Sequence, residues 1–145
     1  MTELRSCLPK TKWHSPSIIS SVAFAAFASV HLVDDFLSEV PLEFHLSVGA
    51  TMLLALAFMT ALVGLVAAAS ARSPLGYLGL AVAGVLITLA QLLKSFPEMS
   101  AQGPWHLGLP SELLALGLAV SAGLTAIFSF RAWRESRRWT NRPMG

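Results

Sequence analysis

Charged residues are scarce in this chain, and their scarcity separates it from soluble proteins. Asp, Glu, Lys and Arg make up only 12% of the 145 residues, whereas hydrophobic residues make up 54%. A soluble domain carries about 25% charged residues. The composition therefore indicates lipid as the surrounding solvent. The length leaves room for one domain, so we expect a single integral membrane domain over residues 1–145.

Cysteines and the common motifs of soluble enzymes are also missing. Cys7 is the only cysteine, which excludes an intrachain disulfide and a cluster of thiolate metal ligands. The chain has no P-loop, no G-x-G-x-x-G, no G-x-S-x-G and no H-E-x-x-H motif. Nucleic-acid binding is not predicted either, because the basic residues lie at the ends of apolar segments and in the tails. Whether the protein is an enzyme stays open at this point.

What the chain does have is long apolar segments. They cover residues of about 16–37, 42–71, 75–93 and 110–130. Each reaches or exceeds the ~20 residues that a helix needs to cross the hydrocarbon core of a bilayer. In lipid the backbone groups must be paired within each segment, which favours helices. We therefore predict an all-α fold, a four-helix transmembrane bundle with antiparallel up-down topology and short loops.

The distribution of charge predicts how this bundle is oriented. Nine of the ten Lys and Arg residues fall on one side of the predicted membrane, and six of the eight Asp and Glu residues fall on the other. The positive-inside rule makes the basic side cytoplasmic. We expect a multi-pass protein of a bacterial inner membrane, with both termini cytoplasmic and basic tails over residues 1–15 and 131–145.

The basic stretch RAWRESRRW after Phe130 is expected to continue the fourth helix past the bilayer. It would orient the protein, or bind anionic lipid headgroups or a partner. Small residues at Gly79-x-x-x-Ala83 and Gly117-x-x-x-Ser121 have the spacing that brings helix backbones together in lipid. They predict packing within the chain, with a homo-oligomer as the alternative.

The segment VHLVDDF carries the most specific chemistry. His31 and Asp35 are four residues apart and share a helix face, with Asp34 on the adjoining edge. Groups of this kind are costly in lipid, so they should face protein or water. His45 lies near the start of the next helix and should come close to them. His31, Asp35 and His45 would form a 2-His-1-carboxylate site for iron, and the same ligand set suits zinc or copper.

Other polar residues near the same face could bind a ligand or support the metal. Gln91 could form a hydrogen bond with one of the histidines, and Lys94 could neutralise Asp34 or Asp35. The full set of expected ligand-binding residues is Asp34, Gln91, Lys94, His106 and Glu112. In the alternative interpretation, His45 and His106 are ordinary residues of the membrane interface. Asp34 and Asp35 then close the first helix near its outer end, and Lys94 is their counter-ion.

Four functions remain open from these residues. The first is a small integral membrane protein whose outward-facing His/Asp pocket binds a metal or small ligand, alone or as a subunit of a larger membrane complex. The second is an accessory or assembly subunit without chemistry of its own. The third is a haem or quinone electron-transfer protein, with haem b as the less favoured cofactor. The fourth is a lipid-directed enzyme with His31 and Asp35 as an acid–base pair. The expected partners are the lipid bilayer, other membrane subunits or a second copy of the chain.

Overall fold

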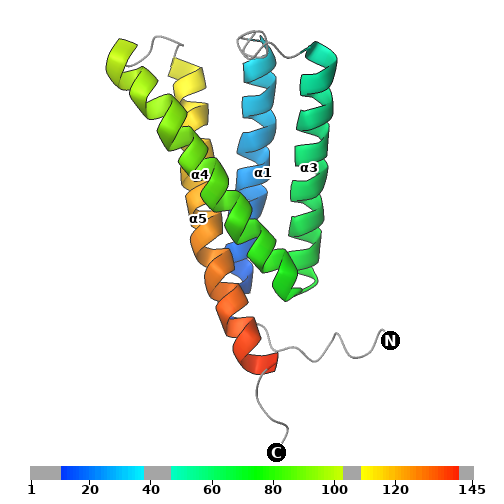
Figure 1. The fold of residues 1–145 in the computed structure, drawn as a ribbon. Coiled ribbons are helices and arrows are strands. Elements are labelled where there is room, and N and C mark those ends of the chain that lie inside the picture. Colours follow the sequence, from blue (N-terminus) through cyan, green and yellow to red (C-terminus); the bar gives the residue numbers. More distant parts are fainter. Residues whose placement is uncertain (1–10, 38–46, 103–108, 141–145) are drawn as a thin grey trace, which may run out of the picture.

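The computed structural model describes residues 11–37, 47–102 and 109–140 (Figure 1). The elements in these ranges are all helices: α1 (His14–Leu37), α3 (Val48–Ser70), α4 (Pro74–Gln102) and α5 (Leu109–Thr140). No strand occurs within the described ranges. The predicted all-α fold with four membrane-length helices is therefore confirmed.

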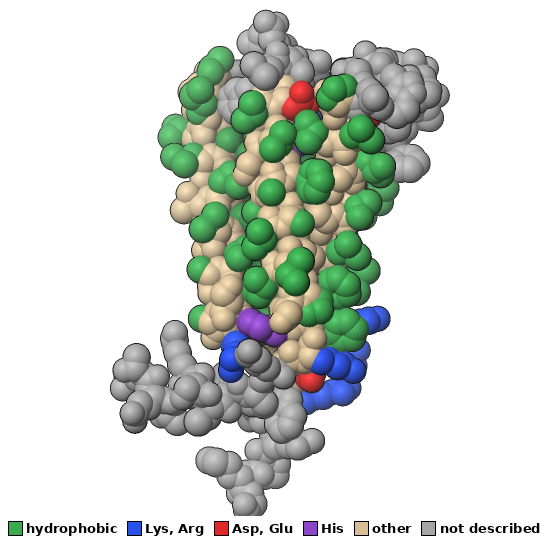
Figure 2. Space-filling view, turned by 180° about the vertical axis from the view of Figure 1, so that it is seen from behind, with side chains coloured by type: hydrophobic (Ala, Val, Ile, Leu, Met, Phe, Trp, Pro, Cys, Tyr) green, Lys and Arg blue, Asp and Glu red, His purple; other side chains and the backbone are tan. Residues whose placement is uncertain are grey.

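Each helix contains a segment long and apolar enough to cross a membrane. The candidate spans are His14–Asp34, Val48–Ser70, Pro74–Lys94 and Pro110–Arg138. Apolar side chains cover the surface between the two ends of the molecule, and Lys and Arg gather at one end (Figure 2). A large exposed apolar surface is rare on a soluble monomer. The four helices support a multi-pass integral membrane protein.

The start of α3 differs from the predicted start near residue 42. Ser47 adopts an extended backbone and its side chain accepts a hydrogen bond from the backbone N–H of Ala50. This N-cap satisfies one of the free N–H groups at a helix start, so the helix begins at Val48. Residues 42–46 lie outside the described ranges.

The turn between α3 and α4 is closed by two backbone hydrogen bonds. Arg72 donates to the carbonyl of Ala69 at 2.8 Å, and Ser73 donates to that of Ala68 at 3.0 Å. This is a Schellman ending, in which the residue after the cap has a left-handed conformation that glycine adopts most easily. Here Arg72 occupies it, with φ of 59°. The chain keeps a cation at a position where glycine would be less strained.

The third helix is longer than predicted, because α4 continues past residue 93 to Gln102 and contains Pro97. Proline removes one backbone hydrogen bond and crowds the carbonyl of Leu93, but the chain need not leave the helix there. Glu98, Met99 and Ala101 follow, and all are good helix formers. The predicted end of this helix near residue 93 was therefore wrong. In contrast, α5 continues through the basic stretch to Thr140, as expected.

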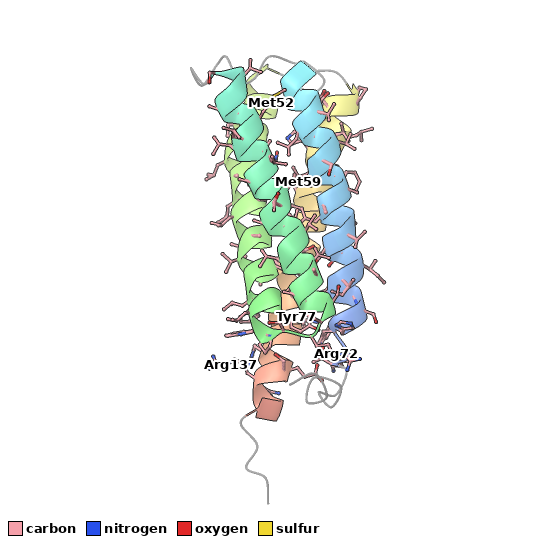
Figure 3. The ribbon with its side chains drawn as sticks, turned by 90° about the vertical axis from the view of Figure 1, so that its right-hand side faces the viewer. Met52, Met59, Arg72, Tyr77 and Arg137 are labelled. Carbon is pink, nitrogen blue, oxygen red and sulfur yellow. The ribbon has the colours of Figure 1, made fainter. Side chains whose placement is uncertain are left out.

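The four helices form a ring in which α5 packs most extensively against α4 and α1, and α3 completes the ring with smaller contacts to α4 and α1. The start of α1, the turn between α3 and α4, and the end of α5 lie at the same end of the bundle (Figure 1). Arg72, Tyr77 and Arg137 mark this end in Figure 3, whereas Met52 lies on α3 toward the other end. The end that contains Arg72, Tyr77 and Arg137 is called the basic end below.

The core combines a few large apolar side chains with a seam of hydroxyl groups. Phe24, Leu62, Tyr77 and Leu80 are almost fully buried. Between α1 and α5, the Ser17 and Ser129 hydroxyl groups share a hydrogen bond of 2.8 Å. Hydrogen bonds of this kind hold helices together in lipid, where apolar contact alone gives no preference over lipid tails.

Several glycines lie where two helices approach each other closely. A Cβ atom on Gly84 of α4 would lie 2.5 Å from the Ala122 carbonyl oxygen and 2.9 Å from the Ala126 nitrogen, both in the backbone of α5. Gly79 and Gly117, in contrast, make room for the side chains of Leu65 and Phe27. The predicted small-residue faces therefore pack within the chain, and the backbone-to-backbone approach of α4 and α5 occurs at Gly84.

Candidate functional site

A pocket of about 360 Å³ lies between α1, α3 and α4, toward the end opposite the basic end, and Leu118 of α5 also contributes to its wall. This volume is within the range of ~300–1,000 Å³ that is usual for small-molecule sites. The described residues that line it are Ala28, His31, Leu32, Thr51, Leu54, Ala55, Phe58, Ile87, Ala90, Gln91, Lys94 and Leu118. Most of these side chains are apolar.

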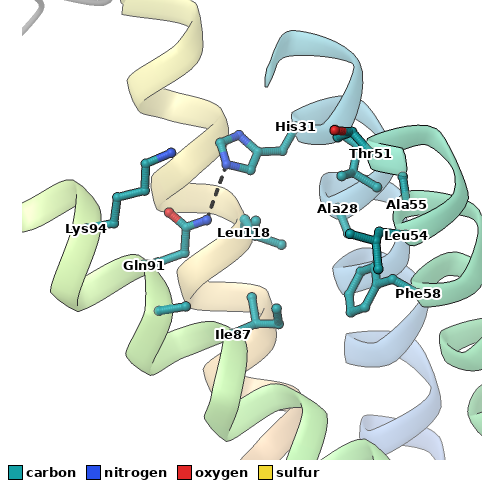
Figure 4. A pocket seen from close by; sticks show the side chains of 12 residues that line it. Ala28, His31, Thr51, Leu54, Ala55, Phe58, Ile87, Gln91, Lys94 and Leu118 are labelled. Atoms are coloured by element: carbon teal, nitrogen blue, oxygen red, sulfur yellow. Dashed lines mark hydrogen bonds between the residues drawn. The ribbon is translucent and has the colours of Figure 1, made fainter. Parts of the chain in front are cut away.

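The polar part of the lining is concentrated on one side of the pocket. His31 of α1 points toward Gln91 of α4, with 3.2 Å between the histidine Nε2 and the amide nitrogen (Figure 4). An amide nitrogen can only donate, so with this placement Nε2 accepts and the ring proton of the neutral histidine is on Nδ1. Lys94 lies one turn further along α4 (Figure 4). A base, an amide and an ammonium group therefore share one edge.

Local helix geometry explains why these side chains meet. On α1, His31 follows the buried residues Phe24 and Ala28 at spacings of seven and three residues. On α4, Gln91 is seven residues after Gly84, which faces the backbone of α5. Residues three, four and seven apart share a helix face. Both polar side chains are consequently on the inner faces of their helices.

A second polar contact joins the same two helices at the basic end. His14 Nδ1 of α1 is within hydrogen-bond distance of the Tyr77 hydroxyl of α4, and the two rings meet edge to face. Since α1 and α4 face each other across the ring, hydrogen bonds cross the bundle near both ends of α1. The apolar core between them is framed by His14–Tyr77 and His31–Gln91.

Only some of the residues predicted for the site line this pocket. The structure brings His31, Gln91 and Lys94 to one pocket. Asp34 and Glu112 do not line it, and Glu112 is buried in the first turn of α5, where the helix dipole favours an acid. Asp35 belongs to α1, but its side chain lies outside the described set, as do His45 and His106.

The metal site stays a prediction. Among the side chains that the structure describes, no three His, Cys, Asp or Glu residues are grouped closely enough to hold a metal ion. Two of the three predicted ligands, Asp35 and His45, are not among those side chains. The hydrogen bond from Gln91 to a histidine, in contrast, is present as anticipated.

The α3 side of the lining was not predicted from the sequence. Thr51, Ala55 and Phe58 of α3 form a wall of the pocket, and their spacing of four and three residues marks a single helix face. That spacing alone could not identify the wall, because every face of α3 is apolar. The position of the wall depends on how α3 packs, which hydropathy does not encode.

Comparison of the chain with protein-family models, with curated proteins and with solved structures found no match. The fold and the four candidate spans define its class, a small multi-pass membrane protein. The function must therefore be inferred from the chemistry of its own side chains.

Proposed function

We propose that this membrane protein binds a small amphiphilic ligand, with a hydrocarbon chain and a terminal carboxylate, in the pocket between α1, α3 and α4. The observation that carries the proposal is the division of the pocket, which has His31, Gln91 and Lys94 along one edge. The remaining lining is apolar apart from Thr51, whose hydroxyl donates to the Ser47 carbonyl. Pockets of this composition fix a ligand by a few convergent polar groups and bury the rest of it against apolar side chains.

Each part of the ligand has a counterpart in the pocket. Leu54, Phe58 and Ile87 would contact the hydrocarbon chain. The Lys94 ammonium would attract the carboxylate, and the amide of Gln91 would donate a hydrogen bond to it. A ring N–H of His31 would donate a second hydrogen bond to the carboxylate. A charge-assisted hydrogen bond is stronger than a neutral one, which favours a carboxylate over an alcohol.

The position of Gln91 favours an organic ligand over a metal. Its amide nitrogen lies 3.2 Å from His31 Nε2, along the side of the ring where a metal ion on that nitrogen would lie. Metal binding at Nε2 would require Gln91 to move. We also propose that the pocket faces the extracytoplasmic side and that the chain termini are cytoplasmic, because the Lys and Arg residues gather at the opposite end (Figure 2).

This function is tested by isothermal titration calorimetry of the purified protein in detergent. The affinities for dodecanoate and for dodecanol are measured. We expect dodecanoate to bind more tightly than dodecanol. His31→Ala should weaken dodecanoate binding about tenfold or more, because a hydrogen bond to a charged group contributes about 1.5–3 kcal/mol. Ser29→Ala is the matched control, since Ser29 is exposed on the same helix and bonds only locally to the Ala25 carbonyl. Its affinity should equal that of the wild type.

The same titration with zinc chloride separates the two ligand classes. Stoichiometric zinc binding that disappears in His31→Ala, without dodecanoate binding, would replace the carboxylate proposal with a metal site. Equal dodecanoate affinity in the wild type and His31→Ala would show that this pocket does not bind the carboxylate.

A further inference from the structure

The basic end of the bundle contains a second pocket, also of about 360 Å³. It lies where the residues just before α1 meet the last turns of α5. Its lining residues are Lys12, Trp13, Arg131, Arg134, Glu135 and Arg138. We call it the basic pocket. It shares no lining residue with the pocket that His31 and Gln91 border.

Positive charge dominates the basic pocket. Four of its six lining side chains are cations and one is an acid, so the formal excess is three positive charges (4 − 1 = 3). Arg131, Arg134 and Arg138 follow one another at spacings of three and four residues, which puts them on one face of α5. Glu135, also on this lining, lowers the net charge without reversing its sign.

Aromatic rings hold this charge in place. The Trp13 ring stacks on Phe128 with 5.8 Å between the ring centroids. Over the same tryptophan ring lie the Arg131 guanidinium at 4.5 Å and the Lys12 ammonium at 5.5 Å. Cations over a tryptophan face are attracted by its π-system, and tryptophan prefers the membrane–water interface. Trp13 would therefore favour a position of these cations near the lipid headgroups.

An apolar stripe leads directly into this pocket along α5. Val120, Leu124 and Ile127 precede Arg131 at spacings of four, three and four residues. These three side chains are between 42% and 54% exposed. The spacing puts them on the same helix face as the arginines. One face of α5 therefore changes from exposed apolar side chains to a cationic cavity within a single turn.

We propose that the basic pocket binds the phosphate group of an anionic phospholipid, with an acyl chain along Val120, Leu124 and Ile127. Arginine guanidinium groups match phosphate oxygens with paired hydrogen bonds. A cavity gives the headgroup a fixed site, whereas a flat basic surface gives only a diffuse attraction to an anionic membrane. The exposed apolar stripe next to the cavity favours a lipid over free phosphate.

Native mass spectrometry with matched lipids tests the proposal. The protein in detergent is mixed with equal amounts of dioleoylphosphatidylglycerol and dioleoylphosphatidylcholine, whose acyl chains are identical. We expect phosphatidylglycerol to be retained about tenfold or more over phosphatidylcholine, because each basic residue near the surface favours anionic lipid. The double variant R131Q/R134Q should lose this preference.

The control variant R72Q/R137Q removes the same amount of charge from the same end without changing the lining of the basic pocket. It should keep the preference. An equal loss in both double variants would overturn the proposal, because the effect would then come from net charge alone. Equal retention of the two lipids by the wild type would also overturn it. If excess inorganic phosphate displaced phosphatidylglycerol completely, the site would be assigned to free phosphate and the lipid assignment would be wrong.

Discussion

Helices α5 and α3 are both apolar enough to span a membrane, yet α5 packs far more extensively against the other helices than α3 does. The span in α5 is 33% buried inside the protein, and that in α3 is 11% buried, although α3 has the highest mean hydropathy of the four spans. Burial within the protein therefore does not follow hydropathy. Lipid tails solvate a leucine as well as another helix does, so association requires something besides apolar surface.

The inner face of α5 has small side chains and hydroxyl groups that favour association with other helices. Ser121, Ala122, Thr125 and Ser129 are buried there, and all are small. They let α1 and α4 approach closely and add hydrogen bonds. The buried residues of α3 are Leu62 and Ala69 alone among those described. Because α3 packs loosely, room remains beside it for the pocket that His31 and Gln91 border.

The largest of the three stability effects considered is expected at Gly84, where α4 lies close to the backbone of α5. Gly84→Ala would bring a Cβ atom within 2.5 Å of the Ala122 carbonyl oxygen and 2.9 Å of the Ala126 nitrogen. Backbone atoms cannot rotate away, so the helices must separate. We expect a loss of about 1–3 kcal/mol in the free energy of unfolding, measured by detergent denaturation followed by circular dichroism. Wild-type stability in this variant would contradict the close approach of α4 and α5.

A smaller effect is expected from the hydroxyl seam of α5. Ser129→Ala removes the hydrogen bond to Ser17, and such bonds between helices contribute on average about 0.6 kcal/mol in membrane proteins. Thr125→Val is the matched comparison, because the Thr125 hydroxyl is buried without a hydrogen-bond partner among the described residues. Removing it should leave the stability unchanged or raise it. Equal losses in the two variants would show that the seam acts through packing and not through hydrogen bonds.

An effect of similar size but opposite sign is expected on α3. A Cβ atom on Gly64 meets nothing within 4 Å, so Gly64→Ala should not disturb a neighbour. Alanine is the better helix former by about 0.5–1 kcal/mol, and the same denaturation experiment should show a slight gain. A loss comparable to that of Gly84→Ala would mean that α3 packs against another helix on this face and would remove the contrast between α3 and α5.

Much of this fold could be predicted from the sequence, because the bilayer restricts the choices. Apolar segments of sufficient length with charged ends predict helices, and all four are present. The errors occurred at helix ends. The cap at Ser47 moved one start, and α4 continued through Pro97. These ends depend on individual hydrogen bonds and on helix propensities, which a hydropathy pattern does not resolve.

The candidate site was predicted only in part. The hydrogen bond expected between Gln91 and a histidine is present, and His31 is that histidine. The wall formed by Thr51, Ala55 and Phe58 was not predicted, since the rotation of an almost uniformly apolar helix is set by its neighbours. At the basic pocket, the sequence predicted the basic stretch of the last helix but not the cavity. Its cavity arises because Trp13, before the first helix, meets Phe128 and Arg131 of the last.

The hydrogen bond between Ser17 and Ser129 joins residues 112 positions apart. During synthesis the first helix is made well before α5. The hydrogen bond of Ser17 can therefore form only after residue 129 has been added. Ser20 and Ser21 form local bonds to the Ser17 carbonyl and need no partner helix. The ring of helices can close only when α5 arrives. A chain that ends before residue 109 therefore lacks the helix against which α1 packs most extensively.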